Sequence, residues 1–321
     1  MFGFFRWGFG RGGNTLILLG FFLTVGIFLH FKDRFFPSGR LWEVVSGIAS
    51  GSISEKAGLW SVLPEPPGAG AETGGIPAEP GKEAALEEVL KRSDFVFPAP
   101  GKAKLELVRH QGFALGYNER YEQAAWVAYP LLREQVIGQS ARERFFNPDP
   151  KVSTGSALFS DYTRSGFDRG HLAPAADFKH SLDQMRETFF MSNISPQNRD
   201  FNAGIWNDLE KLVRAWANRY EKIFVVTGPV LRPGLSSIGK VNRVAVPEKF
   251  YKVILFAEPP HVKGIAFLLD NQPASMPLSK AVVSIDSVET ITGLDFFPML
   301  PDDVSRRIES VSNPKDWFRL K

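Results

Sequence analysis

The apolar and polar residues of the last two thirds of the chain alternate in patterns that predict both helices and strands. The clearest helix is Ile205–Tyr220, whose apolar side chains recur at the three- and four-residue spacing of one helical face. Short runs rich in β-branched and aromatic residues predict strands at Leu105–His110, Ala124–Tyr129, Ile223–Thr227, Val244–Val246 and Phe250–Phe256. This order of elements predicts an α+β domain.

Near the N-terminus an apolar run, Thr15–Phe31, follows Arg6 and Arg11 and precedes Lys32 and Arg34. As a helix it would be ~25 Å long at about 1.5 Å per residue, which is at the short end for crossing a bilayer. A cleaved signal peptide is less favoured because no small-x-small cleavage site follows. A buried core helix is less favoured because basic residues flank both ends. We therefore expect an uncleaved transmembrane signal-anchor at residues 15–31, with residues 1–14 as a cytoplasmic tail and the remaining chain on the extracytoplasmic side.

The next segment separates this predicted anchor from the folded part of the chain. Residues 32–60 are mixed and include a predicted short helix at Leu41–Ile48. Residues 61–81 are dense in Pro, Gly and Ala, a composition typical of a linker because it buries little apolar surface. A short charged helix is predicted at Lys82–Arg92. The expected division is a membrane-proximal segment and linker over residues 32–100 and one catalytic domain over residues 101–321.

The amino-acid composition limits which kinds of catalytic and binding site the chain can form. The 321 residues carry a net charge of only +3, which is a weak sign of a polyanionic partner. Cysteine is absent, so disulfides, zinc–thiolate sites and thiol nucleophiles are excluded. The chain has five histidines. His110 ends a predicted strand, which favours a structural role, and His261 follows two prolines in a predicted loop.

The segment Phe167–Phe178 (FDRGHLAPAADF) contains the histidine with the strongest catalytic pattern. Gly170 permits a tight turn that could expose His171 at a strand end, and a neutral imidazole can accept a proton near pH 7. Arg169 could bind a phosphate oxygen through its planar guanidinium. Taken alone, the motif is equally compatible with a surface turn that holds a local ion pair.

A second polar group follows in Thr188–Glu210, which holds Asn193, Asn202 and Glu210 before and on the predicted helix. An amide oxygen is a hard, neutral ligand that suits Mg²⁺. Alternatively, Asn202 is a helix N-cap and Glu210 an exposed charge. Eight residues of helix rise ~12 Å, so both can bind one ion directly only if Asn202 lies outside the regular helix. We expect Asn202 to bind the metal ion directly and Glu210 to hold a water molecule that is bound to the ion.

Together these segments resemble the DNA/RNA non-specific endonucleases of the ββα-metal type. The family pattern is Asp-Arg-Gly-His, then Ser-Asn-x-x-Pro-Gln, then an Asn before Trp-x-x-Leu-Glu. Here it is matched by Asp168–His171, by Ser192-Asn193 with Pro196-Gln197, by Asn202, and by Trp206 with Leu209-Glu210. The similarity extends over roughly residues 104–300. It implies a mixed or antiparallel sheet core with a ββα-metal catalytic motif.

The resemblance also implies roles for individual residues. His171 matches the general base, Asn202 the direct metal ligand, and Glu210 the residue that positions a metal-bound water. Asn193 matches a polar residue of the catalytic set, and Arg169 the motif arginine. Arg144 loosely matches an upstream phosphate-binding arginine, with Arg142 as the nearby alternative. The expected cofactor is Mg²⁺, with Mn²⁺ as a substitute. The expected partners are DNA and RNA, the membrane through residues 15–31, and, as an open alternative, a second copy of the chain.

The sequence therefore predicts a metal-dependent endonuclease that cuts DNA and RNA without strict sequence specificity. Two alternatives stay open. One is a membrane-tethered nucleic-acid-binding protein without catalysis. The other is a hydrolase for a small or lipid phosphodiester.

Overall fold

The computed structural model describes residues 76–77, 83–140, 145–259, 261–311 and 313–318, which all belong to one compact unit. The predicted signal-anchor at 15–31 and the predicted helix at 41–48 lie outside the described residues. Within the described part of the chain, no helix is both long enough and apolar enough to cross a membrane.

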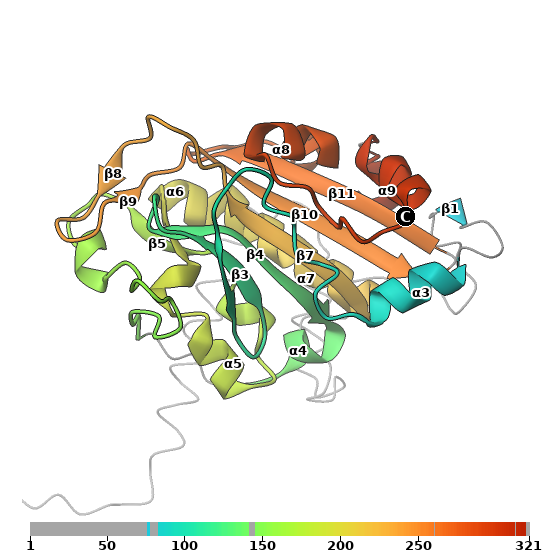
Figure 1. The fold of residues 1–321 in the computed structure, drawn as a ribbon, viewed down its shortest axis with the longest axis horizontal. Coiled ribbons are helices and arrows are strands. Elements are labelled where there is room, and N and C mark those ends of the chain that lie inside the picture. Colours follow the sequence, from blue (N-terminus) through green and yellow to red (C-terminus); the bar gives the residue numbers. More distant parts are fainter. Residues whose placement is uncertain (1–75, 78–82, 141–144, 260, 312, 319–321) are drawn as a thin grey trace, which may run out of the picture. The chain divides into compact units, whose positions relative to one another are not determined.

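A single antiparallel sheet forms the centre of the unit, with the strand order β1-β11-β10-β7-β4-β3-β2 and with β12 paired to β11 (Figure 1). Its strands are β1 (Ile76–Pro77), β2 (Glu106–Arg109), β3 (Ala114–Asn118), β4 (Gln123–Leu132), β7 (Lys222–Pro229), β10 (Lys249–Glu258), β11 (His261–Asp270) and β12 (Val282–Val283). Two further pairs are β5 (Asp168–His171) with β6 (Ile194–Gln197), and β8 (Ser237–Ile238) with β9 (Val244–Ala245). The α+β prediction and the antiparallel core are confirmed.

The helices cover both faces of this sheet. The α-helices are α3 (Glu83–Lys91), α4 (Arg133–Ile137), α5 (Leu182–Glu187), α6 (Arg199–Phe201), α7 (Asn207–Tyr220), α8 (Ile285–Thr292), α9 (Asp302–Glu309) and α10 (Lys315–Phe318). The short turns are η1 (Phe159–Tyr162), η2 (Ala175–Asp177), η3 (Met191–Asn193), η4 (Asn202–Trp206) and η5 (Leu278–Lys280).

Alternation along β10 separates two apolar cores. Phe250, Ile254 and Phe256 belong to the core that α7 covers. Tyr251, Val253 and Leu255 belong to the core on the other face, where α3, α8 and α9 pack. Because successive strand residues point to opposite faces, α7 and the α8–α9 pair lie on opposite sides of the sheet (Figure 1).

The packed structure extends further toward the N-terminus than residue 101, where the domain was expected to begin. The α3 helix buries Leu86 against the sheet, and Phe95 and Val96 follow it into the same core. Phe95 meets Phe224 of β7 edge-on, with ring centroids 4.6 Å apart. The predicted charged helix at Lys82–Arg92 is thus present, and it contributes one apolar face to the core.

The sheet also contains strands that the sequence pattern did not predict. β3, at Ala114–Asn118, lies between two predicted strands and was not itself predicted. His261 was expected in a loop, but it begins β11, which pairs with β10 along its whole length. Lys263 and Gly264 interrupt the apolar run of β11, which weakens the pattern of β-branched and aromatic residues that predicted the other strands.

Candidate active site

The Asp-Arg-Gly-His motif forms β5, whose partner strand β6 carries the Pro-Gln of the second motif. The register pairs Asp168 with Gln197 and His171 with Ile194. His171 ends β5, and its half-buried ring packs edge-on against Phe189 at 4.9 Å between centroids and near Phe146 at 5.6 Å. Two aromatic side chains therefore restrict the imidazole while leaving part of it accessible.

Gly170 is required by the close approach of the neighbouring strand. A Cβ atom at this position would lie 2.0 Å from Oε1 of Gln197 and 2.4 Å from its Cγ. The Gln197 side chain is fully buried, so it has little room to move away. The glycine of the motif thus allows β5 and β6 to pair tightly beside His171.

Arg169 is held by aromatic rings. Its guanidinium carbon lies 4.4 Å from the ring centre of Phe159 and 5.0 Å from that of Phe146. Within the described residues, no carboxylate forms an ion pair with it. A stacked guanidinium keeps N–H groups available for an anion, which suits phosphate binding. Arg144 lies outside the described residues, so its role stays a prediction.

Asn193 is fully buried and supports the loop that follows His171. Its Oδ1 accepts from the backbone N–H of Ala173 at 2.9 Å. Its Nδ2 donates to the carbonyl oxygens of Ala173 at 3.0 Å and Thr188 at 2.8 Å. Since these bonds occupy both ends of the amide, the side chain is placed to hold the backbone rather than to touch a substrate.

Asn202 lies outside the regular helix α7. The short helix α6 is capped by Asn198, whose Oδ1 accepts from the N–H groups of Asp200 and Phe201. A π-turn, η4, then begins at Asn202 and contains Gly204, whose φ/ψ of −96°/−115° is not helical. Only after this turn does α7 begin. The N-cap alternative for Asn202 is therefore wrong, because Asn198 has that role.

The π-turn brings the two motifs into contact. Nδ2 of Asn202 donates to Oδ2 of Asp168 at 3.1 Å. This bond fixes which end of the amide faces Asp168, and it leaves Oδ1 as a free acceptor for a hard cation. His171, three residues beyond Asp168 on β5, belongs to the same local structure.

Glu210 belongs to a buried polar network that the sequence did not indicate. Its Oε2 lies 4.0 Å from Nη1 of Arg214, one helical turn later. The same Nη1 donates to Oδ1 of Asp177 at 2.9 Å, and the Tyr129 hydroxyl donates to Oδ2 of Asp177 at 2.9 Å. Burial opposes the charge of Arg214, but the carboxylates of Asp177 and Glu210 raise the pKa of its guanidinium above the ordinary value. The network fixes the start of α7 relative to the loop after β5.

Lys252, on strand β10, is a further buried charged residue beside this network. It is 1% exposed, its Nζ donates to Thr227 Oγ1 at 3.0 Å, and its ammonium lies 4.7 Å from the centre of the Trp206 ring. Burial lowers the pKa of Lys252 to about 8, although the carboxylates of Glu210 and Asp177 oppose this shift. The sequence analysis missed both Lys252 and Arg214. Nothing in the sequence links a lysine in the middle of an apolar strand to this site. Arg214 could have been found, because its four-residue spacing from Glu210 places the two side chains on the same face of a helix.

His110 takes part in a second buried cluster, beside the Ser-Asn motif. Its Nε2 lies 2.9 Å from Asp149 Oδ2, and its Nδ1 lies 3.5 Å from Glu187 Oε1. Burial opposes the charge of His110, but the two carboxylates raise the pKa of the imidazole. Burial likewise opposes the charges of Asp149 and Glu187, yet hydrogen bonds from His110 and other donors lower the pKa of each carboxyl. The expected structural role of His110 fits these contacts.

These shifts predict a pH window for stability. The contribution of His110 is complete below its unfolded pKa of about 6.5 and is lost as pH rises through the raised folded pKa. The contribution of Asp149 and Glu187 is complete above their unfolded pKa values of about 4 and is lost as pH falls.

His110→Gln should therefore lower the free energy of unfolding by about 3–5 kcal/mol at pH 6 and by less at pH 9. Urea denaturation at both pH values measures this, with the exposed His180→Gln as control. An equal loss at pH 6 and pH 9 would contradict the ion-pair assignment.

Comparison with known proteins identifies the family of this chain. Residues 92–303 match the family model described as DNA/RNA non-specific endonuclease. The mitochondrial nuclease EXOG of Mus musculus is 35% identical over 297 residues, which cover 87% of this chain and 76% of that protein. The mitochondrial endonuclease G of Homo sapiens is 37% identical over 213 residues, covering 62% of this chain and 71% of that protein. A crystal structure of an EndoG/EndoGI complex superposes with a TM-score of 0.61 at 30% identity, covering 71% of this chain and 96% of that one.

The mixed α+β fold with its antiparallel sheet is similar to that of the EndoG structure. The chain belongs to the DNA/RNA non-specific endonuclease family, and it is a non-specific endonuclease. Nucleases of this family depend on a divalent metal ion.

The predicted localisation is wrong. An extracytoplasmic domain on a membrane anchor was expected, but relatives from mouse, human and Saccharomyces cerevisiae are named as mitochondrial nucleases. An apolar N-terminal run with basic flanks does not by itself distinguish anchoring from targeting.

Proposed function

We propose that this nuclease hydrolyses phosphodiester bonds in both DNA and RNA, with His171 as the general base. The observation that carries the proposal is the hydrogen bond between Asn202 and Asp168, at 3.1 Å. It joins the metal-ligand candidate to the strand that ends in His171, although the two motifs are 34 residues apart in sequence. The proposed base on β5 and the proposed oxygen ligand at the start of η4 thus lie on two elements that are in direct contact.

The residues at this position fit a divalent ion. Oδ1 of Asn202 would bind it directly, and Glu210 would hold one of its waters. Mg²⁺ suits this sparse oxygen set because it keeps most of its water shell, and Mn²⁺ would substitute. When bound, the ion would supply charge stabilisation for the phosphorane and the leaving oxygen.

The side chains around it have separate tasks. His171 takes the proton of the attacking water, and the rings of Phe189 and Phe146 keep its imidazole oriented. Arg169 binds a phosphate oxygen, with Arg144 as a second phosphate contact. Asn193 and the Asp177–Arg214 pair hold the loop and the helix on which these groups lie. A homodimer stays a prediction.

No group in this set is placed to read a base edge, so recognition should depend on the phosphate backbone. We expect single-stranded DNA, double-stranded DNA and RNA all to be cut without a recognition sequence. Affinity should fall as salt rises, because each neutralised phosphate releases counterions. The test incubates the full chain with the three polymers and with bis(p-nitrophenyl) phosphate as a small phosphodiester. Discrete plasmid bands that persist, or cleavage of the small ester alone, would contradict the proposal.

A further inference from the structure

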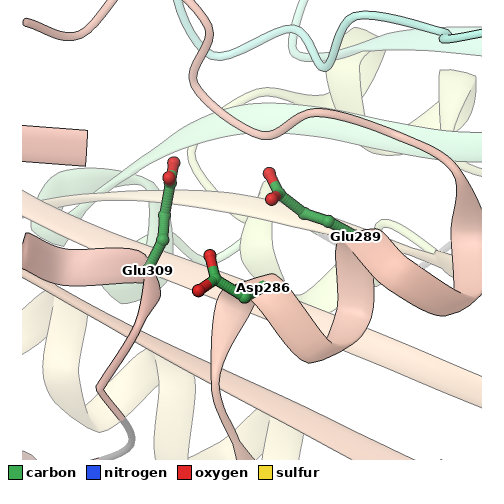
Figure 2. A group of neighbouring side chains, drawn as sticks. All are labelled: Asp286, Glu289 and Glu309. Carbon is green, nitrogen blue, oxygen red and sulfur yellow. The ribbon is translucent and has the colours of Figure 1, made fainter. Parts of the chain in front are cut away.

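Three carboxylates converge on the face of the sheet opposite α7. Asp286 and Glu289 project from the first turns of α8, and Glu309 projects from the last turn of α9 (Figure 2). One oxygen of each lies within 4.8 Å of the others. Asp286 and Glu289 are three residues apart and therefore share a helical face. Two helices thus present like charges to one small volume.

One of these oxygens is buried without a partner. Glu309 is 7% exposed, and its Oε2 accepts from the Ser305 hydroxyl at 2.6 Å. Its Oε1 is inaccessible to solvent and has no hydrogen-bond partner among the described residues. Figure 2 shows this carboxylate directed toward Asp286 and Glu289. A buried carboxylate oxygen with no donor is costly unless a proton or a cation compensates it.

The neighbouring charges offer no compensation. Burial raises the pKa of Glu309 to about 7, and the carboxylates of Glu289, Asp286 and Asp295 act in the same direction. Burial also raises the pKa of Glu289, despite a hydrogen bond of 2.7 Å from the Phe296 N–H to its Oε1. The site therefore favours uptake of positive charge near neutral pH.

We propose that Asp286, Glu289 and Glu309 bind a Ca²⁺ ion that joins α8 to α9. Calcium binds oxygen ligands at about 2.3–2.6 Å, so two ligands can lie up to about 5 Å apart across the ion. Magnesium binds at about 2.0–2.1 Å and needs ligands no more than about 4.2 Å apart. The larger ion accommodates oxygen separations up to the 4.8 Å bound of this cluster without rearrangement. Since α7 and the catalytic residues lie across the sheet, this site is separate from the catalytic metal site.

The ion would act on stability, because α8 and α9 pack on β11 through Ile285, Val288, Val304 and Ile308. An ion that binds only the folded state stabilises it by RT ln(1 + [ion]/Kd), so the melting temperature rises with the logarithm of the ion concentration above Kd. At about 100-fold Kd the expected rise is roughly 5–10 °C.

Thermal unfolding of the full chain at pH 8, with CaCl₂ or MgCl₂, tests the proposal without measuring nuclease activity. Parent protein, the exposed-carboxylate control Glu258→Gln and the catalytic variant Asn202→Ala should all be stabilised by Ca²⁺ and less by Mg²⁺. Glu309→Gln, which keeps the side-chain shape, should lose most of the Ca²⁺ response. A parent protein that does not respond to Ca²⁺, together with a Glu309→Gln variant more stable than the parent, would show that a shared proton compensates the cluster and would overturn the proposal. A Ca²⁺ response lost in Asn202→Ala and kept in Glu309→Gln would overturn it as well, because the ion would then belong to the catalytic site.

Discussion

His171→Ala is expected to reduce phosphodiester cleavage by about 10²- to 10⁴-fold, the usual contribution of a general base. His171 is the last residue of β5, and Asp168 at the start of this strand accepts a hydrogen bond from Asn202. His171 is also the histidine that lies within the Asp-Arg-Gly-His motif. DNA binding should change little, because phosphate contacts are assigned to arginines. Initial rates on plasmid and fluorescence anisotropy with a DNA oligonucleotide measure the two effects separately.

His180→Ala is the matched control for this variant, since His180 is exposed and nine residues further along the chain. It should cleave at the parental rate. Circular dichroism should show both variants folded. A folded His171→Ala protein with near-parental turnover would remove His171 as the base.

The second large effect is expected at Asn202. Asn202→Ala removes the only side-chain oxygen assigned to direct metal binding, so half-maximal activity should require at least about 10-fold more Mg²⁺. Glu210→Gln should lower the maximal rate with a smaller change in Mg²⁺ requirement, because Glu210 acts through a bound water. Mg²⁺ titrations of initial rate at saturating DNA separate the two parameters.

Asp208→Asn, an exposed position on the same helix, is the control for altered helix charge, and its Mg²⁺ requirement should match that of the parent. If Asn202→Ala shows an unchanged Mg²⁺ requirement while Glu210→Gln raises it strongly, the assignment of the direct ligand is reversed.

Local sequence patterns predicted much of this site because its residues lie in short segments. The apolar face of α7 and the strands β4, β7 and β10 follow from local patterns alone. The Asp-Arg-Gly-His motif was expected to turn tightly at Gly170, but it forms strand β5. Helix geometry also showed that Asn202 and Glu210 could both bind one ion directly only if Asn202 lay outside the regular helix. The π-turn that places Asn202 there was not predicted, because it depends on the backbone conformation of Gly204, and a single glycine has no unique conformation in a sequence.

The parts that sequence did not predict depend on long-range contacts. Asp177 pairs with Arg214 across 37 residues, and His110 meets Asp149 across 39. Neither distance could be inferred without the packing of the sheet. In the same way, α8 and α9 bring Glu309 to Asp286, although each acidic residue alone is typical of a solvated helix surface.

Cleavage of plasmid by the full chain, with Mg²⁺ and with excess EDTA, tests the central claim most directly. The account predicts progressive degradation to short fragments in Mg²⁺, no cleavage in EDTA, and recovery when Mg²⁺ is added beyond the chelator. Undiminished cleavage in excess EDTA would contradict the metal-dependent mechanism at Asn202 and His171.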